Sequence, residues 1–236
     1  MTCELLAVCF EARQPQRVAR FWAGVLGREV VDYAGGALLP GEGTQVGLGF
    51  VPSRTEKVGP NRIHLHLTSD SLADQQHTVE AALELGARHI DVGQRPEEGH
   101  VVPTDPEGNE FCVIEPGNKF LDGCGFLGEI ACHGTREVGL FWSAALGWPL
   151  VWDHGEETAI QHPLGGTKVA WGGQAPAPEG WRHRQRFDLV PPRHGDVLSE
   201  VDRLVSLGAT RLDMAGDGTV TLADPDGNRF RVGTPR

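Results

Sequence analysis

Asp-Pro-Glu-Gly-Asn, at residues 105–109, is the stretch that decides the fold, and it recurs as Asp-Pro-Asp-Gly-Asn at residues 224–228. Proline presets φ for the first corner of a turn, glycine tolerates a positive φ, and aspartate or asparagine side chains bond the nearby backbone. Strand-forming residues flank both copies, as in Phe-Cys-Val at 111–113 and Phe-Arg-Val at 230–232. Each copy is therefore predicted to be the turn of a β-hairpin.

Three further groups of residues recur in the same order and at nearly the same interval. The Phe-Trp pair at 21–22 and the Leu-Gly pair at 26–27 both return 120 residues later, and Leu-Gly-Ala at 85–87 returns after 122 residues. The turn itself returns after 119 residues. A nearly constant offset indicates a duplicated domain. We predict two domains of ordinary size, at residues 1–118 and 119–236.

Composition limits the partners of the chain. The formal net charge is −11, which argues against nucleic acid, because nucleic-acid binding needs a basic surface. No apolar run approaches the roughly 18 residues of a membrane span, and the N-terminus lacks the pattern of a signal peptide. The five cysteines are odd in number and show no C-x-x-C spacing. They are read as reduced thiols, which predicts a cytoplasmic protein.

Hydrophobic spacing predicts the same unit four times. Apolar residues at 18, 21, 22, 25 and 26 give one face of a helix that ends at Gly27. The Ile-His-Leu-His-Leu of 63–67 alternates as a half-buried strand, and residues 185–190 form the corresponding strand of the second half. Each unit reads as β-α-β-β-β, so the predicted fold class is α+β.

Four such units, marked by the Phe-Trp, Leu-Gly and hairpin-turn residues, resemble the vicinal oxygen chelate superfamily of glyoxalases, bleomycin resistance proteins and extradiol dioxygenases. The chain looks most like the glyoxalase-like domain group, and the resemblance extends over nearly its whole length. It implies four βαβββ modules that form two curved mixed sheets, with helices on the convex side and a ligand cleft on the concave face. The superfamily hosts several chemistries, so the reaction stays open. The sequence also leaves open whether modules pair within each half or between halves.

The resemblance also implies where a metal would be held. The metalloenzymes of the superfamily bind a divalent ion with His, Gln or Glu from the first and last strands of paired units. Here those positions fall on Ala7, His64, Cys112, Leu127, Arg186 and Arg231. Alanine and leucine have no donor atom, and arginine is always cationic. We therefore predict no catalytic metal and no other cofactor. The alternative is a divalent ion on His64 and His66, which alternation puts on one face.

Three functions remain open. In the first, the protein binds a small molecule in a cleft that contains His64, His66 and Cys112, with Trp171 and Trp181 placed to stack on a flat ligand. In the second, it is a lyase, isomerase or dioxygenase in which one of the same three polar residues acts as acid, base or nucleophile.

The third function is that of a structural or regulatory module with a vestigial cleft. Arg186, Asp188 and Arg231 take, in the second half, the places of the two histidines and the cysteine. They would bind an anion or fill the cleft with an ion pair. The expected partner is a small-molecule ligand or substrate, and a homodimer is left open.

Overall fold

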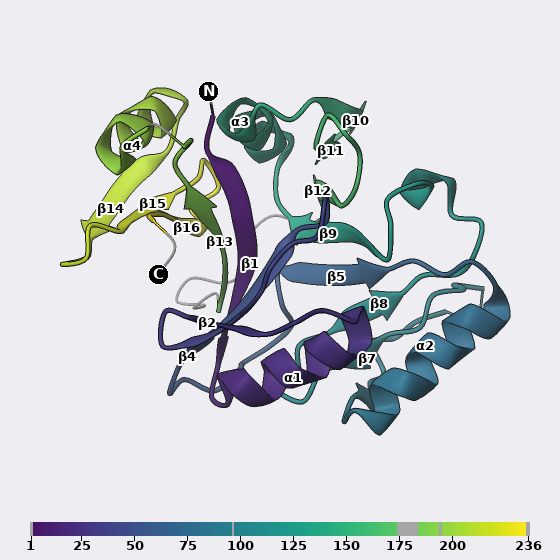
Figure 1. Ribbon diagram of the computed structural model, residues 1–236. Helices are drawn as coiled ribbons and strands as arrows, with labels where there is room; N and C mark the ends of the chain where they lie inside the picture. Colours follow the sequence, from purple (N-terminus) through teal and green to yellow (C-terminus); the bar gives the residue numbers. More distant parts are fainter. Residues whose placement is uncertain (1, 96, 174–183, 194, 235–236) are drawn as a thin grey trace.

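Four modules follow one another along the chain (Figure 1). The structure is a computed structural model that describes residues 2–95, 97–173, 184–193 and 195–234. The first module contains β1 (Glu4–Ala12), α1 (Pro15–Leu26), β2 (Val31–Tyr33), β3 (Gly36–Leu39) and β4 (Gly47–Pro52). The second contains β5 (Ile63–Leu67), α2 (Leu72–Glu84), β6 (Arg88–His89), β7 (Pro103–Thr104) and β8 (Phe111–Val113).

A short 3-10 helix, Lys119–Leu121, lies in the connection between the two halves. The third module contains β9 (Leu127–His133), α3 (Arg136–Leu146), β10 (Leu150–His154), β11 (Glu157–Gln161) and β12 (Lys168–Gly172). The fourth contains β13 (Gln185–Val190), α4 (Val197–Ser206), β14 (Thr210–Met214), β15 (Val220–Ala223) and β16 (Arg229–Val232). The order β-α-β-β-β is thus present four times, as predicted.

The first helix of each half is built by the same local signals. Pro15 begins α1, where its missing N–H costs nothing and its fixed φ suits the first turn. The buried stripe of α1 includes Phe21 and Trp22, so the Phe-Trp pair belongs to the core. The helix ends at Gly27, whose φ of 68° lies in the left-handed region that favours glycine. Gly147 ends α3 in the same way, with φ at 67°.

Strand pairing joins the halves to each other. The larger sheet has the order β14-β15-β16-β13-β1-β4-β3-β2, so it combines the first and fourth modules. The smaller sheet has the order β10-β11-β12-β9-β5-β8 and combines the second and third modules. At the centre of each sheet the first strands of two modules run antiparallel, β1 beside β13 and β5 beside β9 (Figure 1). The question that the sequence left open is therefore answered: modules pair between halves.

The predicted fold class is confirmed. The fold is α+β, and the described residues form four α-helices and two curved sheets that mix parallel and antiparallel pairs. The second module departs from the expected pattern, because β6 and β7 form a separate two-stranded ladder. Two isolated bridges, Val101 with Val113 and Thr104 with Glu110, connect the β7 segment to the β8 segment. In the part of the chain that the structure describes, the smaller sheet consequently has six strands, where two βαβββ modules would supply eight. Among the described residues, no helix is both long and apolar enough to cross a membrane.

Candidate functional site

A polar row crosses the smaller sheet on one face. Cys112 on β8 is in register with His66 on β5, and His66 is in register with Glu129 on β9. Glu129 is in turn in register with Lys168 on β12. Residues in register on neighbouring strands project to the same side of the sheet. The four side chains therefore form a continuous row that consists of a thiol, an imidazole, a carboxylate and an ammonium group.

A floor of small residues lies next to this row. His64 is in register with Ala131, and Ala131 is in register with Ala170, two residues along from the polar row on each strand. Because the alanine side chains are short, they leave a cavity of about 430 Å³ above the sheet. Glu129, Ala131 and His133 of β9 all line it and lie two residues apart, which identifies the face. The residues that line the cavity include His64, Phe120, Glu129, Ala131, His133, Trp152, Ala170 and Trp171.

Aromatic side chains wall the cavity at one side. Phe120 and Trp152 meet edge to face, with ring centroids 6.0 Å apart. Lys168 donates a hydrogen bond from Nζ to the backbone carbonyl of Phe120, and the same nitrogen lies 4.4 Å from the centroid of the Phe120 ring. The cation of the polar row thus holds the aromatic wall in position.

Two neutral imidazoles face the cavity. Burial lowers the pKa of His64 to about 4, an effect that neighbouring His133 and His66 reinforce and that Glu110 opposes. Burial also lowers the pKa of His133, with a further contribution from the charge of Arg62. The two rings meet edge to face with centroids 5.7 Å apart. Each neutral ring offers one donor and one acceptor, so together they suit a ligand with hydrogen-bonding oxygen atoms.

His66 has the opposite protonation state. Burial alone would lower its pKa, but hydrogen bonds with Cys112 and Glu129 and the charge of Glu129 raise the pKa of His66 to about 10. The bond between His66 Nδ1 and Glu129 Oε2 is 2.7 Å long. His66 is therefore an imidazolium at neutral pH, whereas His64, two residues earlier on the same strand, is neutral. One strand supplies both forms of the side chain to one face.

The corresponding face of the larger sheet is occupied by its own side chains. Arg186 and Asp188 form a buried ion pair, with Nε to Oδ1 at 2.8 Å and Nη2 to Oδ2 at 3.3 Å. Asp188 Oδ2 also accepts hydrogen bonds from the Tyr33 hydroxyl at 2.8 Å and from the Cys9 thiol at 3.1 Å. A hollow of about 180 Å³ remains beside Asp188 and Arg231.

A glycine on β4 makes room for this buried cluster. A Cβ atom at Gly49 would lie 2.4 Å from Cys9 Sγ, which is closer than real contacts allow. The larger sheet thus supports the reading in which Arg186 and Asp188 fill the cleft, while the smaller sheet keeps an open cavity.

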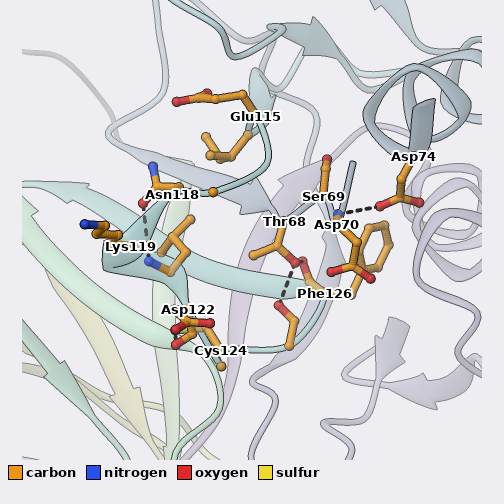
Figure 2. A pocket seen from close by; sticks show the side chains of 15 residues that line it. Thr68, Ser69, Asp70, Asp74, Glu115, Asn118, Lys119, Asp122, Cys124 and Phe126 are labelled. Atoms are coloured by element: carbon orange, nitrogen blue, oxygen red, sulfur yellow. Dashed lines mark hydrogen bonds between the residues drawn. The ribbon is translucent and has the colours of Figure 1, made fainter. Parts of the chain in front are cut away.

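A third hollow, of about 600 Å³, lies where the connection between halves meets the end of β5 (Figure 2). Some of its polar groups serve the loops that form it, whereas Ser69 Oγ and Glu115 Oε2 are buried without a hydrogen-bond partner among the described residues. Thr68 donates to the carbonyl of Gly125 at 3.0 Å, and Asp74 accepts from the backbone of Asp70 at 2.9 Å. Asn118 caps the 3-10 helix through its side-chain oxygen. None of the residues predicted from sequence lines this hollow, which we assign to the seam between the halves.

The donor set of the polar row does not match that of the metalloenzymes that the chain resembles. The first and last strands of the paired second and third modules carry His66, Cys112, Glu129 and Lys168 on the cavity face. A lysine ammonium has no lone pair for a metal, and it would repel a cation bound beside it. Among the described residues, no group of three or more His, Cys, Asp or Glu side chains is placed to hold a metal ion. These residues do not fit a divalent ion held in that manner.

The residues predicted from sequence divide between the two sheets. His64, His66 and Cys112 come together on the smaller sheet, and Arg186, Asp188 and Arg231 come together on the larger one. Trp171 lies in the core with 3% of its surface exposed, and it reaches only the boundary of the cavity. Trp181 lies outside the residues that the structure describes.

Glu129, His133 and Lys168 were not predicted. The metal-ligand position that the resemblance implies on this strand is Leu127, and the residue that contacts His66 is Glu129, two residues further along. A signal was present in the sequence of β9, where Glu129, Ala131 and His133 alternate with apolar residues. That alternation marks the cavity face, but it does not reveal the partner strand.

Comparison with solved structures confirms the architecture. The superposition on glyoxalase I from Zea mays includes 98% of this chain and 92% of that protein, with a TM-score of 0.69 and 16% sequence identity. The superposition on a protein of Bacillus subtilis subsp. subtilis str. 168, named "putative dioxygenase", includes 98% of this chain and 84% of that protein. Its TM-score is 0.64 and the sequence identity is 13%. Identities this low establish the shared fold and leave the reaction undetermined.

Comparison by sequence identifies the family. No curated protein sequence matches the chain. A family model for the glyoxalase-like domain matches twice, at residues 7–114 and at residues 129–233. Both matches coincide with the repeated halves, and together they account for most of the chain. The protein therefore belongs to the glyoxalase-like domain family, with two tandem copies of the domain in one chain.

Proposed function

We propose that this protein binds a small, largely apolar molecule that carries a hydrogen-bonding oxygen, in the cavity above Ala131 and Ala170, and that it does so without the divalent metal of its relatives. The observation that carries this proposal is the cavity of about 430 Å³ on the smaller sheet, set against the ion pair that fills the larger one. Ligand sites are concave and mostly apolar, with a few convergent polar groups.

The lining suits a flat ligand. Ala131 and Ala170 provide a smooth floor, and Phe120 and Trp152 provide an aromatic wall. The neutral rings of His64 and His133 can each donate one hydrogen bond to a carbonyl or hydroxyl oxygen. Since these two rings carry no charge at neutral pH, an ionised group on the ligand is not needed at this end of the cavity.

The absence of a catalytic metal is part of the proposal. Its support is the ammonium of Lys168, which stands in register with Glu129, and the engagement of Glu129 with His66. Glu129 is buried, with 8% of its surface exposed, and it is paired with the imidazolium of His66. A metal ion bound to Glu129 would have to break this buried ion pair.

A second candidate is an enzyme that uses the His66–Glu129 pair for proton transfer. The 2.7 Å contact favours it, because it fixes the orientation of the imidazole and leaves Nε2 facing away from the carboxylate. The hypothesis of a structural or regulatory module is supported only by the larger sheet, where side chains fill the cleft.

A thermal-shift screen tests the proposal. Aromatic alcohols and carbonyl compounds are screened against the native protein, with the metal content measured on the same sample by elemental analysis. A ligand at 100 times its Kd raises the free energy of unfolding by about 2.7 kcal/mol, which is a readily measured shift. About one transition metal per chain, retained after dialysis, would contradict the metal-free part of the proposal.

Variants locate the site of any ligand found. Ala170→Leu fills the floor and should abolish binding, whereas Ala215→Leu adds the same bulk at the hollow of the larger sheet and should leave binding unchanged. His64→Ala and His66→Ala should weaken binding while the fold is kept. Undiminished affinity in Ala170→Leu and in both histidine variants would remove the site from the smaller sheet.

A further inference from the structure

Glu129 has one carboxylate oxygen engaged and the other free. Its Oε2 lies 2.7 Å from His66 Nδ1, and among the described residues no donor lies within hydrogen-bond distance of Oε1. Oε1 is not one of the fully enclosed oxygens that lack a partner, so it retains accessible surface. Glu129 lines the cavity above Ala131, and only 8% of its surface is exposed. A nearly buried carboxylate therefore presents an unpaired acceptor at the cavity.

An unpaired acceptor at this place selects the group that a ligand puts against it. An ether, ester or carboxylate oxygen seated on Oε1 would oppose lone pair to lone pair and leave a buried acceptor unsatisfied. An N–H or O–H group would instead donate a hydrogen bond to it, and bonds to an ionised acceptor are stronger than bonds between neutral groups. The ligand therefore needs a donor in addition to the oxygen that the neutral histidines bind.

The charges around Glu129 favour a donor that is itself uncharged. The imidazolium of His66 already balances the carboxylate at 2.7 Å, and the ammonium of Lys168 stands in register with Glu129 on the neighbouring strand. An ammonium group of a ligand at Oε1 would add a third positive charge beside these two, and like charges at such short range repel each other. A neutral N–H group keeps the hydrogen bond without that repulsion.

The spacing of the polar groups favours a donor and an acceptor on separate atoms. His64 is in register with Ala131, two residues from Glu129 along β9, and two residues of a strand span about 7 Å. A hydroxyl group has its donor and its acceptor on one oxygen atom. A cyclic amide presents N–H and C=O side by side on one edge of a flat ring, so its two polar atoms can face Glu129 and the neutral imidazoles at the same time.

We propose that the cavity selects a flat cyclic amide, of the lactam type, whose N–H donates to Glu129 Oε1 and whose carbonyl oxygen accepts from a neutral imidazole. This inference rests on the proposed function, because it names the class of ligand that the same cavity binds. An apolar ring fused to the amide would lie over the floor of small residues, toward the wall formed by Phe120 and Trp152. Glu129 is thereby the residue that decides specificity.

Two compounds of nearly equal shape test the donor. 2-Quinolone has the N–H and C=O of a lactam, and coumarin has a ring oxygen in place of the N–H. Isothermal titration calorimetry should give coumarin a Kd roughly 10- to 100-fold higher, the range expected when a buried acceptor is left unpaired. Ala170→Leu should abolish the binding of 2-quinolone, which assigns it to this cavity. Equal affinities of the two compounds for the native protein would overturn the inference.

Two variants test the acceptor. Glu129→Leu removes the carboxylate, so 2-quinolone and coumarin should bind this variant with similar Kd values. Glu157→Leu is the matched control, because Glu157 also lines the cavity but is exposed, and the native ratio of Kd values should be kept. A ratio kept in Glu129→Leu, or lost in Glu157→Leu, would contradict the assignment. If Glu129→Leu does not fold, the two compounds still decide the matter in the native protein.

The outcomes separate this inference from the proposed function. Equal binding of 2-quinolone and coumarin overturns the cyclic amide and leaves the cavity function intact. Binding of aromatic alcohols without binding of 2-quinolone has the same meaning. If neither compound binds, and no alcohol or carbonyl compound of the thermal-shift screen binds, the inference and the proposed function both fail.

Discussion

Asp105 holds both its own turn and the helix beneath it. Its Oδ1 accepts hydrogen bonds from the backbone of Glu107 and Asn109, and its Oδ2 accepts from the side chains of Asn109 and Trp22. Asp224 repeats the arrangement, with Trp142 Nε1 at 3.2 Å. The turn motif and the Phe-Trp pair recur together because they are in contact.

We expect Asp105→Asn to lower the free energy of unfolding by about 2–3 kcal/mol, because the new amide would face two donors and leave buried groups unpaired. Urea denaturation of the variant measures this loss. Asp32→Asn, at an exposed position of β2, is the matched control and should change stability little. A loss in Asp105→Asn no larger than in the control would contradict the role of the carboxylate.

His64 should make the protein sensitive to mild acid. The pKa of its ring is about 4 in the folded chain and about 6.5 in the unfolded chain. Above pH 6.5 both states hold the neutral ring, so the contribution of His64 to stability is fully present. As pH falls from 6.5 to 4, the unfolded chain takes up a proton that the folded chain refuses, and stability is lost.

Between pH 7 and pH 4.5, the free energy of unfolding should fall less in His64→Gln than in the native protein. The difference should be on the order of 2 kcal/mol. Urea denaturation at the two pH values gives the difference. The other ionisable residues are identical in the two proteins, so their contributions largely cancel in the comparison. Identical losses in both proteins would show that His64 is not kept neutral.

At the scale of elements, the two sheets have the same plan and different contents. In both, the first strands of two modules lie antiparallel at the centre, and a side chain of one strand bonds a side chain of the other. Glu129 bonds His66 in the smaller sheet, and Cys9 bonds Asp188 in the larger. The larger sheet adds Arg186, which turns its face into a buried ion-pair cluster.

Arg186→Ala should destabilise the protein by about 3–5 kcal/mol, since it leaves the buried carboxylate of Asp188 without its counter-ion. The double variant Arg186→Met with Asp188→Leu should recover most of that loss, because apolar residues of similar volume replace the pair. Thermal and urea denaturation measure both changes. Ligand affinity at the smaller sheet should be unaffected in the single variant, and a parallel loss of affinity would contradict the separation of the two faces.

At the scale of the whole molecule, two kinds of contact connect the modules. The ring of Trp22 on α1 packs against Phe111 on β8, with centroids 4.9 Å apart, and so joins modules of the same half. Trp142 and Phe230 repeat this contact in the second half, also at 4.9 Å. The sheets, in contrast, join modules of different halves. A single core therefore contains buried residues from all four modules.

We expect residues 1–118 not to form a stable monomer when expressed alone. Without the second half, β1 loses β13 and β5 loses β9, so two strands would expose unpaired edges and apolar side chains. Light scattering should show a dimer or larger species, and addition of residues 119–236 should restore a complex with the melting temperature of the intact chain. A folded monomer of 1–118 that is as stable as the full protein would contradict this.

The sequence by itself determined the local structure and the duplication. Helical spacing and a terminal glycine were enough for α1, alternation located β5, and the repeat located β13. These features depend on residues close in sequence. By contrast β14 was not located, because all five of its residues are exposed and show no alternation in burial.

Only the tertiary structure decided which modules share a sheet and which residues meet on it. Every module offers a similar edge strand, so the pairing of β5 with β9 depends on the assembled core and is absent from any local pattern. The contact of His66 with Glu129 depends in addition on the register of β5 against β9, which no local pattern in the sequence fixes. The protonation of His66 and the neutrality of His64 follow from that same assembly, because burial and the facing charges set the pKa of each ring.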